Sequence, residues 1–303
     1  MRWIKRGLVL RAPAHLPWAR THAALPIVQA LNGSRARVYF SARDDRSRAQ
    51  IGRAVLDLDD ASFDPEFESE PVIRMGSRGA FDDSGVTGGC LVESGRTQHL
   101  YYSGWNLGSE VPFLFFIGCA MSTDGGKTFE KVSPSPVLGR SRIDPFLTAS
   151  PSILIEGGVW RMWYVSGTGW SAGADREPSY LIRYAESTDG VEWRPTGRVC
   201  VGYSYEGEHA IARPHVLKDG KTYRMWYSHR GPSYRIGYAE SNDGLEWKRM
   251  DADSGIDVSA EGWDSEMVAY PWVGDIGGAR RMLYNGNGFG LTGIGQAVAS
   301  GNI

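Results

Sequence analysis

Cysteine is scarce in this chain of 303 residues, and its three cysteines lie far apart, at Cys90, Cys119 and Cys200. An odd number with no C-x-x-C pair indicates neither a disulfide framework nor a zinc site, so we expect buried free thiols in a reducing compartment. Acidic and basic residues nearly balance, with a formal net charge of −2. Because no basic tract could follow a phosphate backbone, we expect no nucleic-acid partner.

Long hydrophobic runs are missing as well. The N-terminal stretch MRWIKRGLVLRAP has an apolar run of only four residues, which is too short for the core of a signal peptide. No segment approaches the length of a membrane span. We therefore expect a cytoplasmic protein with no membrane partner.

Short strand-like segments separated by glycine-rich turns fill the chain instead, and one of them recurs five times. Its copies are VYFSARD, LYYSGWN, MWYVSGT, MWYSHRG and MLYNGNG, which begin at Val38, Leu100, Met162, Met225 and Met282. An apolar strand precedes each copy, a third strand follows it, and the middle copies have a fourth. Four strands repeated five times, without helical periodicity, predict an all-β fold. We expect one domain over residues 1–303, a five-bladed β-propeller with four-stranded antiparallel blades.

The last copy of the repeat lacks its outer strand, which would leave an open sheet edge. Trp3 and Gly7 have the same spacing as Trp193 and Gly197 in the outer strand of the third copy. We therefore predict that residues 2–11 pair as the outer strand of the last blade and close the ring.

A second repeated phrase follows the third strand of the middle copies. It reads STDGGKTF, STDGVEW and SNDGLEW, carries Asp124, Asp189 and Asp243, and resembles the Asp-box of sialidases. In an Asp-Gly turn the carboxylate can bond the backbone of its own turn. We therefore predict that these three residues are scaffold, on the face opposite the functional site.

Acidic residues gather where the first strands of four blades begin. The predicted catalytic residues are Asp82, Asp83, Asp144 and Glu208, and Asp264 and Glu266 occupy the same place in the last blade. Carboxylates that converge on one mouth of the channel would repel one another and raise some pKa values, as acid–base chemistry requires.

The loops between second and third strands lie on the same predicted face. Tryptophan rings there could stack on a sugar, and arginines could bond hydroxyls or anions. The predicted substrate-binding residues are His22, Arg43, Trp105, Trp170, His209, Arg213, Arg230, Asp264, Glu266 and Asn285.

With these features the chain resembles the five-bladed propeller glycosidases of the arabinanase, xylosidase and invertase type. The motif IDP at 143–145 resembles the segment that carries the middle Asp of that group's catalytic trio. The resemblance implies that Asp83, or else Asp82, is the base or nucleophile, that Asp144 orients it, and that Glu208 is the proton donor. As a donor, Glu208 is expected to have a raised pKa.

The first blade departs from that group, because it offers His22 and no carboxylate at the mouth. Either the trio is displaced by one blade or the chemistry differs. The chain also resembles propeller proteins encoded near bacterial surface-polysaccharide genes. These resemblances imply a small-molecule or oligosaccharide substrate, and a glycoside hydrolase acting on a sugar that is related to surface polysaccharide or linked to a nucleotide.

Two alternatives stay open. Arginines near the mouth would suit a sugar phosphorylase or a glycosyl-transferring enzyme, and a carbohydrate-binding propeller without catalysis is the other. We expect no cofactor and no metal, and a structural role for His22 and His209 is favoured over metal binding.

Overall fold

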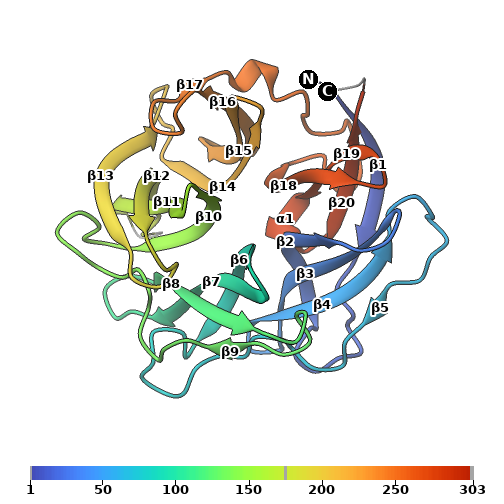
Figure 1. Cartoon of the computed structure of the whole chain (residues 1–303), viewed down its shortest axis with the longest axis horizontal. Helices are drawn as coiled ribbons and strands as arrows, with labels where there is room; N and C mark the ends of the chain where they lie inside the picture. The colour runs from blue at the N-terminus through green and yellow to red at the C-terminus, as the bar shows by residue number, and fades with distance from the viewer. Residues whose placement is uncertain (1, 174–175, 301–303) are drawn as a thin grey trace.

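The computed structural model describes residues 2–173 and 176–300. Strands fill these residues almost throughout, and the helical segments are the short turn η1 (Asp251–Asp253) and α1 (Asn287–Gly290). Figure 1 shows the strands arranged in a ring around a common centre. The prediction of an almost all-β, propeller-like fold is confirmed.

Within the described ranges the strands form one four-stranded sheet and two eight-stranded sheets. In each eight-stranded sheet a single parallel bridge, β4 to β6 or β12 to β14, joins two antiparallel groups of four strands, and we refer to each group of four as a unit. The first unit is β2 (Thr21–Ala30), β3 (Arg35–Arg43), β4 (Ala49–Asp57) and β5 (Glu66–Phe67). The second is β6 (Gly85–Ser94), β7 (Thr97–Leu107), β8 (Phe113–Ser122) and β9 (Glu130–Lys131). The third is β10 (Thr148–Glu156), β11 (Val159–Trp170), β12 (Pro178–Ser187) and β13 (Arg194–Val201). The fourth is β14 (Ala210–Asp219), β15 (Thr222–Arg230), β16 (Tyr234–Ser241) and β17 (Lys248–Arg249). The fifth is β18 (Ala269–Ile276), β19 (Ala279–Asn285), β20 (Ile294–Ala299) and β1 (Trp3–Leu10).

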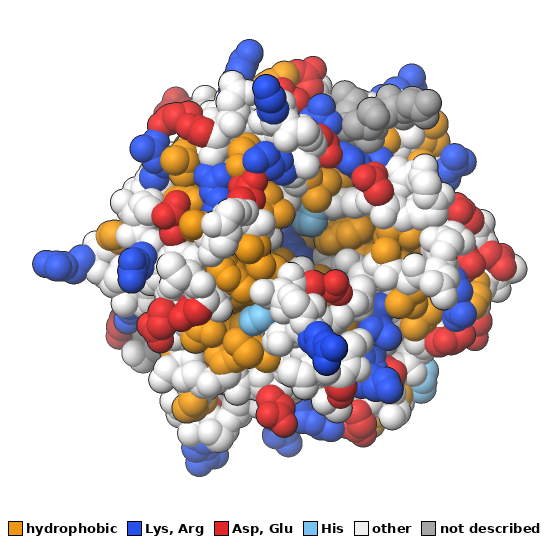
Figure 2. All heavy atoms as spheres, in the orientation of Figure 1, with side chains coloured by type: hydrophobic (Ala, Val, Ile, Leu, Met, Phe, Trp, Pro, Cys, Tyr) orange, Lys and Arg blue, Asp and Glu red, His pale blue; other side chains and the backbone are white. Residues whose placement is uncertain are grey.

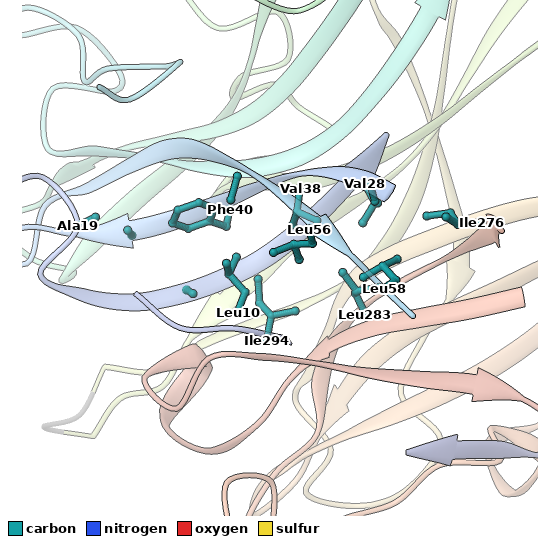
Figure 3. Close-up of a cluster of buried hydrophobic side chains, with 14 of the residues drawn as sticks. Leu10, Ala19, Val28, Val38, Phe40, Leu56, Leu58, Ile276, Leu283 and Ile294 are labelled. Atoms are coloured by element: carbon teal, nitrogen blue, oxygen red, sulfur yellow. The ribbon is translucent and has the colours of Figure 1, made fainter. Parts of the chain in front are cut away.

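The N-terminal strand completes the last unit, as predicted. β1 pairs antiparallel with β20, with Trp3 opposite Ala299, so the last unit gains its outer strand from the start of the chain. A buried cluster then seals the junction between the last unit and the first, with Leu10 from β1, Phe40 from β3 and Leu283 from β19 (Figure 3). Burial of this shared apolar surface joins the two ends of the chain.

The first strands of the units contact one another around the centre, and β18 contacts β2. In four of the five second strands, one side chain reinforces this ring by accepting a hydrogen bond from a backbone N–H of the next unit. These bonds run from Gly88 to Ser41 (2.9 Å), Ser150 to Ser103 (2.9 Å), Tyr270 to Ser228 (2.7 Å) and Leu25 to Asn285 (2.8 Å). In the second strand of the third unit, β11, the equivalent residue is Val165. Its side chain has no polar atom, so this hydrogen bond is not made between the third and fourth units.

Asn285 joins the last unit to the first through both polar atoms of its side chain. Its Oδ1 accepts the N–H of Leu25, and its Nδ2 donates to the carbonyl oxygens of Ala23 and Gly293, both at 2.8 Å. The residue is fully buried. The prediction that Asn285 binds substrate is therefore wrong, because its hydrogen-bonding capacity is used to close the ring.

Substituting Asn285→Leu should lower the free energy of unfolding by several kcal/mol. Leucine has a similar size but leaves one N–H and two carbonyl groups buried without this partner, at a cost of about 1–3 kcal/mol for each group. Urea unfolding measures the loss. Asn242→Leu, at an exposed turn, is the matched control, and equal stability of the two variants would contradict the closure role.

The repeated Asp-Gly phrase is scaffold, as predicted. Asp124, Asp189 and Asp243 each accept N–H groups of their own turns. The carbonyl oxygen of Gly190 also accepts the Tyr101 hydroxyl of the preceding unit. The phrase therefore recurs because it both shapes the turn and fastens one unit to the next.

The cysteines are free, as the sequence suggests. Cys119 and Cys200 are buried, whereas Cys90 is partly accessible. Burial raises the pKa of all three thiols to about 12, so they are protonated at neutral pH.

Candidate functional site

A cavity of about 680 Å³ lies at the centre of the ring, on the face where second strands lead into third strands. Residues from all five units line it, which places it on the face predicted for the functional site. Figure 2 shows one face of the ring hollowed at its centre, with hydrophobic side chains around the hollow and a basic side chain within it.

Aromatic rings form much of the cavity wall. They are Trp105, Phe113, Phe115, Tyr180, Tyr234, Tyr270 and Phe289. Gly85 lies directly against the indole of Trp105, and a Cβ added to Gly85 would be 2.2 Å from Trp105 Nε1. The absence of a side chain at Gly85 therefore seats Trp105 in the wall. Such a wall suits the apolar face of a sugar ring.

The charged residues that line the cavity are mostly basic. They are Arg43, Arg176, Arg230 and Glu177, with His22 beside them. Burial and the neighbouring Arg43 lower the pKa of His22 to about 4, so its imidazole is neutral at pH 7. Glu177 is the one carboxylate among the described lining residues.

Glu177 lies in the loop that precedes β12 and forms an ion pair with Arg230 of β15. Its other oxygen lies 3.7 Å from Nε2 of His209. The guanidinium of Arg230 also lies over the ring of Tyr234, 5.6 Å from its centroid. Two units therefore position the carboxylate at the cavity.

The predicted catalytic acids Asp82, Asp83, Asp144 and Glu208 do not converge on this cavity, and none of them lines it. Asp83 instead fixes its own loop, where it accepts the N–H of Gly79 at 2.9 Å. The four acids do not meet at this cavity, because the other three are bound inside their own units. Their catalytic role stays a prediction.

Four acids share one structural environment, in which each is buried and bonds to side chains of later strands. The sets are Asp82 with Tyr102 and Lys131, Asp144 with Tyr164, Ser166 and Arg183, Glu208 with His229 and Arg249, and Asp264 with Tyr284 and Lys5. The first unit has no such acid, and Trp18 packs against Phe40 there instead, with ring centroids 6.0 Å apart. We refer to these four sets as the acid clamps, since each carboxylate holds strands of one unit together.

Glu208 shows most clearly how these acids are held. Its side chain is fully buried, and it accepts hydrogen bonds from Arg249 at 2.8 Å and from His229 at 3.0 Å. Burial alone would raise its pKa, but these hydrogen bonds and the charge of Arg249 lower it to about 2. The expectation of a raised pKa is therefore wrong, and Glu208 is an anion at neutral pH.

The predicted substrate-binding residues divide into two groups. His22, Arg43, Trp105 and Arg230 line the cavity. The others do not line it, and they are Trp170, His209, Arg213, Asp264, Glu266 and Asn285. Trp170 lies just behind the wall, with its ring 5.3 Å from that of Phe113.

Sequence reasoning missed Arg176, Glu177, Tyr180, Tyr234 and Tyr270 in the cavity wall. Tyr270 had a signal in the sequence, because it directly precedes a proline that recurs in four of the first strands. In all four strands the residue before this proline has a positive φ, and these residues are Leu25, Ser150, Arg213 and Tyr270. The strained backbone at these residues interrupts the hydrogen bonding between the first and second strands of these units, and it changes the direction of the side chain that precedes the proline.

In the ranges that the structure covers, no group of three or more His, Cys, Asp or Glu side chains is placed to hold a metal ion. Nor does any helix in those ranges have the length and apolar character needed to cross a membrane. The cytoplasmic location stays a prediction.

The fold is that of propeller-type glycoside hydrolases. One solved structure described as a glycoside hydrolase matches with a TM-score of 0.76 and 18% identity, covering 98% of this chain and 92% of the other. A thermostable family-43 glycoside hydrolase matches with a TM-score of 0.67 and 17% identity, over 95% and 91% of the two chains. The Bombyx mori GH32 β-fructofuranosidase BmSUC1 matches with a TM-score of 0.62 and 14% identity, over 95% and 62%. At such identities the likeness concerns the fold.

No family model matches the chain. Relatives of higher sequence identity occur among mycobacterial proteins. "Uncharacterized protein Rv1502" of Mycobacterium tuberculosis (strain ATCC 25618 / H37Rv) is 45% identical over 298 residues, 98% of this chain and 99% of the relative. "Uncharacterized protein MT1551" of strain CDC 1551 / Oshkosh matches to the same extent. The chain belongs to the same family as these two proteins.

Proposed function

We propose that this protein is a glycoside hydrolase built on a five-bladed β-propeller, and that its sugar binds in the central cavity. The observation that carries the proposal is the cavity itself, whose described lining combines a wall of aromatic rings with one carboxylate, that of Glu177. The shared fold of glycoside hydrolases supports it as an analogy. The proposed substrate is a sugar of a bacterial surface polysaccharide or a nucleotide-linked sugar.

Glu177 is the proposed proton-transferring residue. Glycoside cleavage needs one group to protonate the leaving oxygen and another to activate water or attack carbon. Positioned by its ion pair with Arg230, Glu177 accepts the proton of the attacking water in this proposal, and the leaving oxygen takes its proton from solvent. The acid clamps are not part of this proposal, because their carboxylates are bound within the units.

A carbohydrate-binding propeller without turnover is the second candidate. It is favoured by the single carboxylate in the described lining, since most glycosidases use two. The aromatic wall would serve binding equally well in both cases.

A substrate panel tests the proposal. Purified protein is incubated with oligosaccharides and nucleotide-linked sugars, with and without inorganic phosphate, while released reducing sugar and calorimetric binding are both measured. Release without phosphate supports a hydrolase, and release that depends on phosphate supports the phosphorylase alternative. Binding without release supports the second candidate, and neither binding nor release by any sugar contradicts both.

Trp105→Ala should weaken binding of the sugar by about three- to tenfold. The indole face is part of the wall, and contacts to an aromatic face contribute about 0.5–1.5 kcal/mol. Trp105→Phe retains an aromatic ring and should recover most of the affinity in the same calorimetric titration. Unchanged affinity in the alanine variant would show that the sugar does not contact this wall.

A further inference from the structure

We propose that the central cavity recognises an anionic group on its sugar, a carboxylate or a phosphate, which is seated beside the Tyr270 hydroxyl between Arg43 and Arg230. The inference rests on the proposed function, in that a sugar occupies the cavity. It adds that this sugar is acidic.

The charge balance of the wall is the first observation. Glu177 is matched by Arg230, with which it forms an ion pair. Arg43 forms no salt bridge and no side-chain hydrogen bond to any residue that the structure describes, although it lines the cavity. Since His22 is neutral at pH 7, no described residue of the wall compensates the charge of Arg43, which is exposed to solvent.

A second uncompensated cation lies directly behind the wall. Arg213 is buried, and its guanidinium donates to the carbonyl oxygens of Gly88 (2.8 Å) and Pro26 (2.9 Å). No carboxylate of a described residue lies within salt-bridge distance of it. Its neighbour Ala212 lines the cavity. A buried charge without a counter-ion is costly, and its field reaches further in low-dielectric surroundings than in water.

Tyr270 marks the place where these charges act together. Tyr270 lines the cavity together with Arg43 and Arg230. Besides burial, the neighbouring Tyr180 raises the pKa of Tyr270, while the positive charges of Arg43, Arg230 and Arg213 oppose this rise. Burial raises the pKa of Tyr270 above its ordinary value, so the hydroxyl is a neutral donor. Among the described residues this hydroxyl has no hydrogen-bond partner. An anionic oxygen at this point would accept its proton and balance the arginines.

The aromatic wall and the basic centre together select the ligand class. A neutral sugar would cover the rings but leave Arg43 without a counter-ion. A uronic acid or a phosphorylated sugar satisfies both requirements, because each combines a ring with an anionic group. Both sources present oxygen acceptors of the same kind, so the proposal concerns their shared chemistry.

Calorimetric titration at low salt, with galacturonate, glucuronate, glucose 6-phosphate, galactose and glucose as probes, tests this inference. At least one acidic sugar should bind about tenfold or more tightly than its neutral counterpart, because hydrogen bonds to charged groups are strong. Preference for the uronates assigns the group to a carboxylate, and preference for glucose 6-phosphate assigns it to a phosphate. Raising the salt concentration should weaken the acidic probe alone.

Three variants separate recognition of the anion from general damage. Arg43→Gln should weaken binding of the acidic probe about tenfold and change that of the neutral probe by less than about twofold. Tyr270→Phe keeps the ring and should reduce the same preference. Arg46→Gln, at an exposed position of the same loop, is the matched control and should leave both affinities unchanged.

The outcomes also separate this inference from the proposed function. Equal affinity for acidic and neutral sugars would overturn the inference, and cleavage of a neutral glycoside would at the same time support the hydrolase. An equal loss for both probes in Arg43→Gln would likewise overturn it. Preferential binding of an acidic sugar that is never cleaved would support the inference and contradict the hydrolase.

Discussion

Arg249→Met should lower the free energy of unfolding by about 3–5 kcal/mol, because it leaves a buried carboxylate without its cation. Arg249 donates to both oxygens of Glu208, at 2.8 Å and 2.9 Å, and also pairs with Asp251. Methionine retains the length of the side chain and loses the charge. Urea unfolding at pH 7 measures the effect through the transition midpoint and slope.

The neighbouring Lys248 supplies the control and pH supplies a second measurement. Lys248 lies on the same strand, β17, at an exposed position. The variant Lys248→Met should therefore change the free energy of unfolding by less than about 0.5 kcal/mol. Glu208 has its pKa lowered from 4.5 to about 2 in the folded protein. Its ion pair therefore stabilises the fold fully above pH 4.5, and this contribution is lost as the pH falls towards 2. The difference between the Arg249 variant and the wild type should narrow over that range, and a constant difference would contradict the acid clamp.

The fold could be predicted from the sequence because the repeat exposes it. Each copy of the phrase begins with three apolar or aromatic residues, and the recurrence of whole phrases indicates that the units share one structure. The spacing of Trp3 and Gly7 carried enough information to place the N-terminal strand on the last unit. These features are local, so they are visible without knowledge of distant contacts.

The acid clamps could not be recognised in the same way, because their cations lie far along the chain. Asp82 meets Lys131, and Asp264 meets Lys5, only after the unit is assembled. One signal was present in the sequence. The third position of the repeated phrase is tyrosine in four copies and Phe40 in the first, which is also the copy that lacks the acid. In three of these copies the tyrosine hydroxyl donates to the acid, whereas Tyr227 in the fourth unit donates to Asp251.

The two sets of polar residues therefore have different roles. Buried carboxylates hold strands together within four of the units, and loop residues around the centre remain open to a ligand. A site needs such a rigid support if its groups are to be held in position. Acidity at the start of a strand was a poor guide to chemistry here, because a buried acid with a cation of its own is a structural element.

Glu177→Gln should lower the turnover of a cleaved glycoside by about two to four orders of magnitude. Glutamine preserves the shape of the side chain and its contact with Arg230, but it cannot accept or release the proton, and positioned acid–base groups contribute factors of this size. The affinity for the substrate should change little, so the loss should appear in kcat with a nearly constant KM.

The control for this variant is Glu206→Gln, which changes an exposed acid outside the cavity and should leave turnover intact. Stability distinguishes a chemical role from a structural one. The Glu177–Arg230 pair is partly exposed, and such pairs contribute at most about 1 kcal/mol, so the unfolding midpoint should barely move. Full turnover in Glu177→Gln would exclude this residue as the proton-transferring group. The arginines and aromatic rings of the cavity would then account for binding, and the group that transfers the proton would have to come from the substrate or from the tyrosine hydroxyls.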